Sequence, residues 1–140
     1  MSDLERMAEG FVRLSAALQR RKGELGGPAA ELTTTQAIAL RTVVREGPLR
    51  MGAVADALGT TVATASRTVD ALATRGLVAR EPDPDDARCV RVAPTAAGTG
   101  EYAARRERFL RALDALANEL SEPERARLAD ALDTLAELFA

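Results

Sequence analysis

Residues 61–67 carry the side chains whose chemistry says most about function. They combine hydroxyl groups, a small methyl side chain and a guanidinium at helical spacing, namely Thr61, Ala63, Thr64, Ser66 and Arg67. Hydroxyl and guanidinium groups can bond base edges or phosphates of DNA, and an alanine can contact a thymine methyl group. Arg67 is the best candidate for a two-bond contact, because its planar fork matches a base edge or a phosphate. The simpler alternatives are a solvated helix position for Arg67 and a helix N-cap for Thr61.

Arginines on either side of this segment supply further candidates for phosphate contacts. Of the 19 basic residues, all but Lys22 are Arg. The candidates are Arg50, Arg75, Arg80 and Arg91. Each one is as consistent with plain surface charge as with a phosphate contact. Arg41 and Arg45 are expected to be solvated helix positions.

The sequence offers little for catalysis or metal binding. It has no histidine and a single cysteine, Cys89, and no phosphate-binding loop or metal-ligand spacing. An enzyme is therefore not expected, and neither is a cofactor or a metal. Cys89 lies in a predicted short strand and is interpreted as a small packing residue rather than a redox sensor. Asp83, Asp85 and Asp86 lack the spacing of a calcium loop and predict a solvated turn.

A helix, a tight turn, a second helix and a hairpin must position these candidates. Apolar periodicity and capping residues predict helices over residues 33–47, 52–58 and 62–75, and short strands over residues 77–80 and 89–92. Gly59 begins the turn between the second and third of these helices, and Gly76 ends the third. A charged, turn-rich loop joins the two strands.

Both ends of the chain are predicted to form amphipathic helices, over residues 3–22 and 98–120 and after a cap at Ser121. The first of them is expected to be broken by Gly23, Gly26, Gly27 and Pro28. The stripes of Leu, Phe and Met on these helices are too extensive for the small middle lobe to cover. Their predicted partners are each other and a second copy of the chain.

The predicted fold class is mainly α with a small β-hairpin wing, in a winged helix-turn-helix lobe flanked by dimerisation helices. Residues 1–32 would form an N-terminal dimerisation helix and linker, residues 33–95 the DNA-binding lobe, and residues 96–140 the C-terminal dimerisation helices. In such a lobe the second helix of the turn, the recognition helix, enters the major groove. The hairpin, or wing, reaches the flanking backbone or the minor groove.

A series of motifs resembles the multiple-antibiotic-resistance regulator (MarR) family. They are TTTQ at 33–36, GPL at 47–49, VADALG at 54–59, VDAL at 69–72, GLVAR at 76–80, DPDDAR at 83–88 and TAAG at 95–98. The resemblance runs in order along nearly the whole chain. Two positions depart from it. Ala87 stands where the family often has a second Arg, and Pro94 replaces the usual Leu, which predicts a frayed end of the second wing strand.

The resemblance implies a homodimer that regulates transcription by binding a pseudo-palindromic site on double-stranded DNA. Arg88 resembles the wing arginine that enters the minor groove, with Asp86 nearby to hold its side chain; the simpler alternative is an exposed ion pair. The resemblance also implies repression that a small anionic or phenolic ligand relieves from a cleft between the dimer helices and the DNA lobe. Phe11 and Tyr102 are candidates for lining that cleft, although core packing is the simpler interpretation of both.

A competing interpretation is a winged-helix module that binds proteins or ligands but not DNA. The formal net charge of -2 mildly favours it, whereas Arg67, Arg88 and the polar start of the recognition helix oppose it. Residues 33–95 contain eight Arg and seven Asp or Glu, so the predicted lobe is close to neutral rather than acidic. The distribution of charge, rather than its sum, therefore decides binding.

The N-terminal residues include early acidic side chains and no apolar core, so no secretory signal is expected. No stretch is apolar enough to predict a membrane span. The expected location is the cytoplasm.

Overall fold

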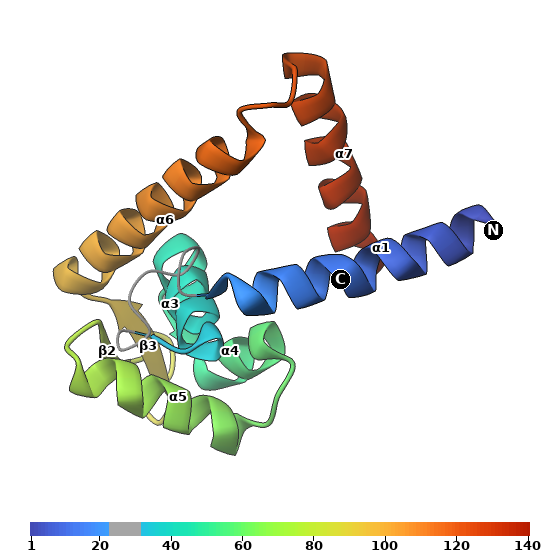
Figure 1. The fold of residues 1–140 in the computed structure, drawn as a ribbon. Helices are drawn as coiled ribbons and strands as arrows, with labels where there is room; N and C mark the ends of the chain where they lie inside the picture. The colour runs from blue at the N-terminus through green and yellow to red at the C-terminus, as the bar shows by residue number, and fades with distance from the viewer. Residues whose placement is uncertain (23–31) are drawn as a thin grey trace.

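The structure, a computed structural model, describes residues 1–22 and 32–140. The elements in chain order are α1 (Asp3–Arg20), α3 (Thr34–Glu46), β1 (Leu49–Arg50), α4 (Met51–Leu58), α5 (Val62–Thr74), β2 (Val78–Pro82), β3 (Val90–Pro94), α6 (Ala96–Ala117) and α7 (Glu122–Leu138). Elements α3 to β3 form one lobe, from which α6 leads away, as Figure 1 shows. The helix breakers predicted at Gly23, Gly26, Gly27 and Pro28 lie outside the described residues.

The predicted fold class is confirmed, and the sheet gains one strand. The described residues form helices and a small antiparallel sheet with strand order β1-β3-β2. The predicted wing hairpin is β2 and β3. Strand β1 adds a third strand, because Leu49 pairs with Val92 and Arg50 with Arg91. The segment before the helix-turn-helix is thereby tied to the wing.

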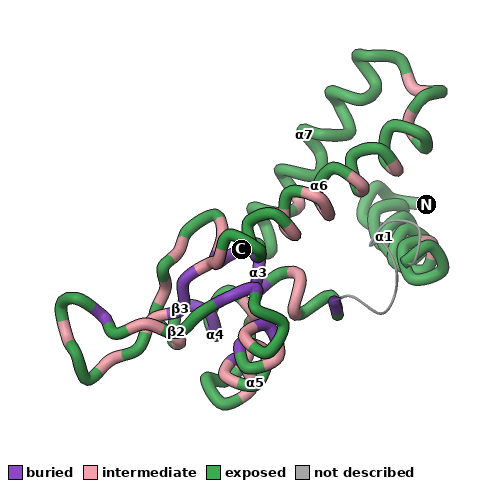
Figure 2. The backbone as a smooth tube through the Cα atoms, turned by 90° about the vertical axis from the view of Figure 1, so that its left-hand side faces the viewer, coloured by how far each residue is buried: buried purple, intermediate pink, exposed green. Residues whose placement is uncertain are grey.

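The hydrophobic core lies between the three lobe helices and the central strand. Its largest fully buried side chains are Leu40, Val43, Val54, Val69, Leu72 and Val92. Figure 2 shows that the buried residues are concentrated in this lobe, whereas α1, α6 and α7 are mostly exposed. Close packing of α4 and α5 on this core fixes which face of α5 points outward.

Local capping signals set the ends of the lobe helices. Thr33 and Gln36 form a capping box at the start of α3, with reciprocal bonds of 3.1 Å. Gly59 ends α4 in the left-handed conformation, with φ of 62°, which a glycine adopts without steric cost. Thr61 then caps α5. These residues produce the tight turn that the sequence predicts.

Pro94 does not fray the second wing strand, contrary to the sequence-based prediction. It is part of β3 and lies opposite Val78. The next pair is joined by a 3.2 Å bond from the Thr95 N–H to the Leu77 carbonyl. Because bonded and non-bonded pairs alternate in an antiparallel ladder, the nitrogen of Pro94 faces away from β2. On the other side of β3, β1 pairs only with residues 91–92 and does not reach Pro94, so no ladder bond is lost.

Helix α6 begins on top of the wing and the recognition helix. The Thr95 hydroxyl accepts a 3.0 Å bond from the Gly98 N–H and donates a 2.6 Å bond to the Gly76 carbonyl just beyond α5. A Cβ atom at Gly98 would lie against the carbonyl oxygen of Leu77, so the close approach requires glycine. The base of α6 is thereby seated directly on the lobe.

Helices α1 and α7 contain no buried residue. They meet where Phe11 stacks on Phe139, with ring centroids 6.4 Å apart. Figure 1 shows α7 turning back from the far end of α6 to reach α1. Large apolar side chains that stay exposed on the two helices include Leu4, Met7, Phe11, Leu14, Leu128 and Leu132. Within residues 1–22 and 32–140, every helix is too short or too polar to cross a membrane.

Candidate nucleic-acid interface

Helix α5 presents a polar first half to the outside of the lobe. The Thr61 hydroxyl accepts a 3.2 Å bond from the Thr64 N–H, so this residue is an N-cap, as its alternative interpretation holds. Thr61, Ala63 and Arg67 are exposed, and Thr64 and Ser66 are half-buried. The opposite face packs into the core through Ala65, Val69 and Leu72. The five candidate residues of α5 therefore lie together on one accessible face.

Two of the candidate arginines have guanidinium groups that are free to meet a ligand. Arg67 lies in the middle of α5 and Arg75 at its C-cap, and both are exposed. Neither forms an ion pair within the part of the chain that the structure describes. Their charges are therefore not neutralised by a neighbouring carboxylate.

Arg88 projects from the turn of the wing with its orientation fixed by Asp86. Its Nε and Nη2 donate bonds of 3.0 and 3.2 Å to the two oxygens of that carboxylate. Its backbone N–H donates a third, of 3.1 Å. These bonds to Arg88 lower the pKa of Asp86. The Arg88 side chain is nevertheless 90% exposed, so it is both positioned and accessible.

Asp83 is not solvated, contrary to the interpretation of the acidic turn. It is 8% exposed, and its two oxygens have separate partners. Oδ2 accepts a 2.8 Å bond from Arg50 Nε, and Oδ1 accepts a 2.8 Å bond from the Asp85 N–H. The bond from Arg50, with those from backbone N–H groups, lowers the pKa of Asp83 from 3.8 to about 2. The sequence did not reveal this pair because 33 residues separate its members.

The Asp83 carboxylate should make folding pH-dependent. Because its pKa is lower in the folded state, its contribution to stability is complete above 3.8 and is lost as the pH falls toward 2. We expect the free energy of unfolding to drop less across this range in Asp83→Asn than in the unsubstituted protein. Urea unfolding at a series of pH values measures this difference. The control is Asp85→Asn, which should follow the unsubstituted protein. An equal drop in all three would contradict the assignment.

The remaining candidate arginines of the interface are held by acidic partners. Arg80 Nη1 lies 2.6 Å from Asp70 Oδ1 on α5, and Nη2 lies 3.4 Å from both the carbonyl and the hydroxyl oxygen of Ser66. Arg91 Nε donates a 2.6 Å bond to Glu81 across the hairpin. Together with Arg50, these residues bind carboxylates of the lobe itself, whereas Arg67 and Arg75 do not.

Cys89 lies beside the carboxylate that holds the wing arginine. Its Sγ is 3.6 Å from Asp86 Oδ2, and the side chain is half-buried just before β3. Strand β3 starts at Val90, one residue later than predicted. In the described ranges, no group of three or more His, Cys, Asp or Glu side chains is arranged to hold a metal ion.

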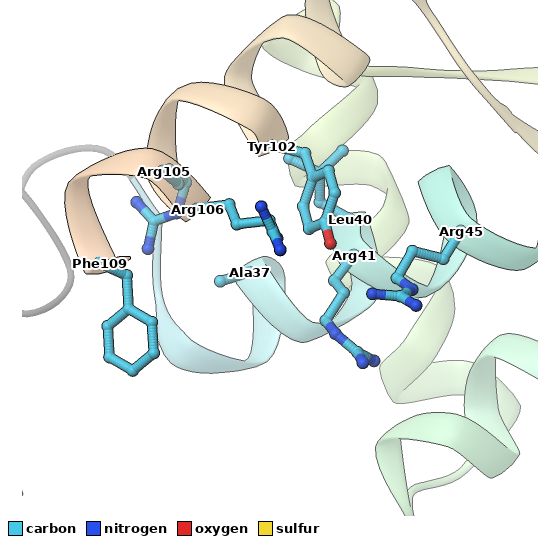
Figure 3. Close-up of a pocket in the computed structure, with 8 residues that line it drawn as sticks. All are labelled: Ala37, Leu40, Arg41, Arg45, Tyr102, Arg105, Arg106 and Phe109. Atoms are coloured by element: carbon cyan, nitrogen blue, oxygen red, sulfur yellow. The ribbon is translucent and has the colours of Figure 1, made fainter. Parts of the chain in front are cut away.

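An open cavity of about 440 Å³ lies between α3 and the first half of α6. Tyr102 lines it together with Phe109, Ala37, Leu40 and four arginines, Arg41, Arg45, Arg105 and Arg106. Figure 3 shows these arginines approaching the cavity from the two helices, with Tyr102 between them. Nη1 of Arg105 is buried without a hydrogen-bond acceptor among the described residues. The cavity therefore combines an aromatic, apolar wall with unneutralised positive charge.

The two candidate ligand-lining residues lie in different places. Tyr102 lines this cavity, whereas Phe11 lies in the groove between α1 and α7. The sequence-based interpretation assigned none of the four arginines to a ligand site. Arg41 and Arg45 are exposed, as expected, but they also border this cavity. A usable signal was present, because Arg41 and Arg45 are spaced to share one face of a helix and Arg105 and Arg106 are adjacent.

The comparisons with known proteins agree with this arrangement. Residues 30–88 match the model of the MarR family. A MarR-like transcriptional regulator from Thermotoga maritima is 28% identical, with a TM-score of 0.71, and the match covers 99% of this chain and 97% of that one. A MarR family protein from Bacillus stearothermophilus is 23% identical, with a TM-score of 0.85 and coverage of 99% and 98%. FabT of Streptococcus pneumoniae, solved in complex with DNA, is 17% identical, with a TM-score of 0.79 and coverage of 98% and 97%. No curated protein matches the chain in sequence.

A winged helix-turn-helix lobe carried on long terminal helices is the fold that this chain shares with these structures. Both the sequence of the lobe and the fold of the whole chain point to the same group of proteins. Residues 30–88 are thus similar in sequence to the MarR family, and the chain as a whole resembles MarR-like transcriptional regulators in fold.

Proposed function

We propose that the protein is a sequence-specific DNA-binding regulator of transcription that represses as a homodimer. The observation that carries this proposal is that one lobe presents two surfaces suited to contact DNA, the first half of α5 and the wing. The exposed polar half of α5 with Arg67 suits the major groove. Arg88, whose guanidinium is oriented by Asp86, suits the minor groove. The DNA complex of FabT, which has the same fold, supports the proposal. Such a protein acts in the cytoplasm, where the chromosome lies.

The proposed DNA contacts divide by role. Thr61, Ala63, Thr64, Ser66 and Arg67 would meet base edges and nearby phosphates, Arg75 would meet a phosphate, and Arg88 would enter the minor groove with Asp86 orienting it. The DNA lobe is close to neutral, so non-specific attraction to phosphates is modest. Specific binding therefore depends on a few placed contacts more than on net charge.

The proposed homodimer rests on the terminal helices. Residues 1–32 and 96–140 would hold two copies together, because the apolar side chains of α1 and α7 remain exposed in a single chain. A two-fold dimer places its recognition helices about 34–36 Å apart, one turn of DNA, and so matches a pseudo-palindromic site. Residues 33–95 would act as one DNA-binding lobe in each copy.

Selection of bound fragments from genomic DNA tests the proposal. We expect the protein to retain a small set of fragments that share a pseudo-palindrome, at low and at moderate salt. Filter binding of the selected fragments against shuffled sequences measures the specificity ratio. No selective retention at either salt would contradict DNA binding and favour the alternative, a winged-helix module that binds ligands or proteins only.

The cavity between α3 and α6 favours a small anionic or phenolic effector. Its arginines can pair with a carboxylate or phenolate, and the rings of Tyr102 and Phe109 can contact an aromatic body. Bound between the DNA lobe and a dimerisation helix, such a ligand would shift the lobe relative to its partner and so lower DNA affinity.

We expect an aromatic hydroxy acid such as 4-hydroxybenzoate to bind and to weaken retention of the selected DNA. Arg106→Gln removes one exposed cation of the cavity and should weaken ligand binding by about tenfold, because a charge-assisted pair is lost. Calorimetry measures the affinity. The matched control is Arg111→Gln, since Arg111 lies on the same helix but pairs with Glu107 outside the cavity. Equal ligand affinities in the two variants would contradict this site.

A further inference from the structure

The guanidinium groups of Arg50 and Arg80 bind carboxylates of the lobe, whereas that of Arg75 does not in the part of the chain that the structure describes. Both were candidates for phosphate contacts, yet each is paired with a carboxylate of another element of the lobe. Arg75, by contrast, is exposed and has no ion pair among the described residues. These carboxylates hold the Arg50 and Arg80 side chains against the lobe, 53% and 35% exposed, whereas the Arg88 side chain stays 90% exposed beside Asp86.

The first pair joins the strand before the helix-turn-helix to the turn of the wing. Arg50 lies in β1, and Asp83 follows directly after β2. The acceptor oxygen lies 2.8 Å from Arg50 Nε in a carboxylate that is almost completely buried. The other oxygen of Asp83 holds the N–H of Asp85, inside the loop that carries Arg88. This pair therefore fixes where the loop leaves the sheet.

The second pair joins the wing to the recognition helix. Arg80 in β2 lies 2.6 Å from Asp70 of α5 and approaches both oxygens of Ser66, one turn earlier on the same helix. The Arg80 side chain is 35% exposed and that of Asp70 is 60% exposed, so water screens this pair in part. A single guanidinium thus bridges the first wing strand and the outer face of α5.

We propose that Arg50 and Arg80 are positioning residues that hold the wing at a fixed angle to the recognition helix, and are not phosphate contacts. This inference rests on the DNA-binding function proposed above and names residues that act on it through Asp83 and Asp70. Arg88 and α5 must meet adjacent grooves of one duplex together. The two ion pairs hold Arg88 and α5 at a constant distance from each other, so less conformational freedom is lost when DNA binds.

Removing a carboxylate distinguishes a positioning role from simple electrostatics, because the two predict opposite changes in DNA affinity. Asp83→Asn and Asp70→Asn each remove a negative charge near DNA, which alone would tighten binding. Positioning predicts the opposite, a loss of about threefold to tenfold in affinity for a selected fragment, the scale of a partly exposed ion pair. The matched control is Asp85→Asn, which removes the same charge from the same turn without breaking either pair. Its affinity should stay level or rise slightly.

Salt dependence separates the two kinds of arginine. The slope of log affinity against log salt is negative, and each lost phosphate contact makes it less steep by about 0.9. We expect this change for Arg75→Gln. Arg50→Gln and Arg80→Gln should bind more weakly with an unchanged slope. Arg50→Lys keeps the charge but not the fork, so it should also weaken binding if the role is positional. The charge-swapped double variant Arg80→Asp with Asp70→Arg should recover affinity that Arg80→Asp loses.

Thermal unfolding and gel filtration of each variant confirm that it is folded and dimeric before affinity is compared. Tighter binding by Asp83→Asn and Asp70→Asn, or slopes less steep by about 0.9 in Arg50→Gln and Arg80→Gln, would overturn the positioning role while leaving DNA binding intact. Failure of the unsubstituted protein to select any DNA would overturn the proposed function itself, and the inference with it.

Discussion

Deleting residues 1–22 should turn the protein into monomers or aggregates that no longer bind a pseudo-palindromic site with useful affinity. The deletion removes α1 and leaves the apolar face of α7, including Leu128, Leu132 and Leu135, without the side chains that line the other side of their groove. Two linked half-sites gain about 100- to 10,000-fold in affinity over one, and a monomer loses that gain. Light scattering gives the assembly state, and fluorescence anisotropy gives the affinity.

A point variant makes the same test without shortening the chain. Phe11→Asp places a carboxylate in the groove between α1 and α7, where Phe11 stacks on Phe139. Ala16→Asp adds the same charge to another side of α1 and is the matched control. We expect the first to dissociate and the second to remain a dimer. A stable, soluble dimer after both the deletion and Phe11→Asp would refute the role of α1.

Arg67→Ala and Arg88→Ala should each weaken specific DNA binding by about tenfold to a hundredfold, because each removes a guanidinium able to make paired bonds to a base edge. Arg67 lies on the exposed face of α5, and Arg88 is presented by Asp86. Anisotropy titrations with a selected fragment and a shuffled one measure the loss. The affinity for the shuffled fragment should change less.

The control for both is Arg111→Ala, which removes a guanidinium from α6, outside the DNA lobe. Binding by all three variants as tight as that of the unsubstituted protein, with dimers intact, would remove Arg67 and Arg88 from the interface. A loss in Arg88→Ala alone would assign specificity to the wing and leave Arg67 as a solvated helix position.

The helix-turn-helix was predictable because its signals are local. Thr33, Gly59 and Thr61 each act within four residues of their position, through a cap or a left-handed turn, so the sequence alone predicts where α3, α4 and α5 begin or end. The polar face of α5 follows from the same periodicity, because its apolar positions must face the core. For this reason the candidate residues of α5 do lie together.

The features that sequence analysis missed are contacts between distant parts of the chain. The pairing of β1 with β3, the burial of Asp83 against Arg50 and the four arginines lining the cavity between α3 and α6 all depend on tertiary packing. A charged turn with three Asp residues looks solvated unless the position of Arg50 is known. Pro94 likewise reads as a strand breaker until the register shows its nitrogen facing away from β2.

The seat of α6 at Gly98 gives this residue an importance that no DNA contact would suggest. Any larger residue there must push α6 away from Leu77 at the base of the wing. In the proposed dimer, α6 connects the DNA-binding lobe of each copy to the dimer interface. Over the 22 residues of α6, about 33 Å, a change of about 10° at the base moves the far end by about 6 Å, a little under two base pairs of DNA. In such a dimer, a substitution at Gly98 would change the distance between the two recognition helices, and with it the length of operator bound, without altering any proposed DNA contact.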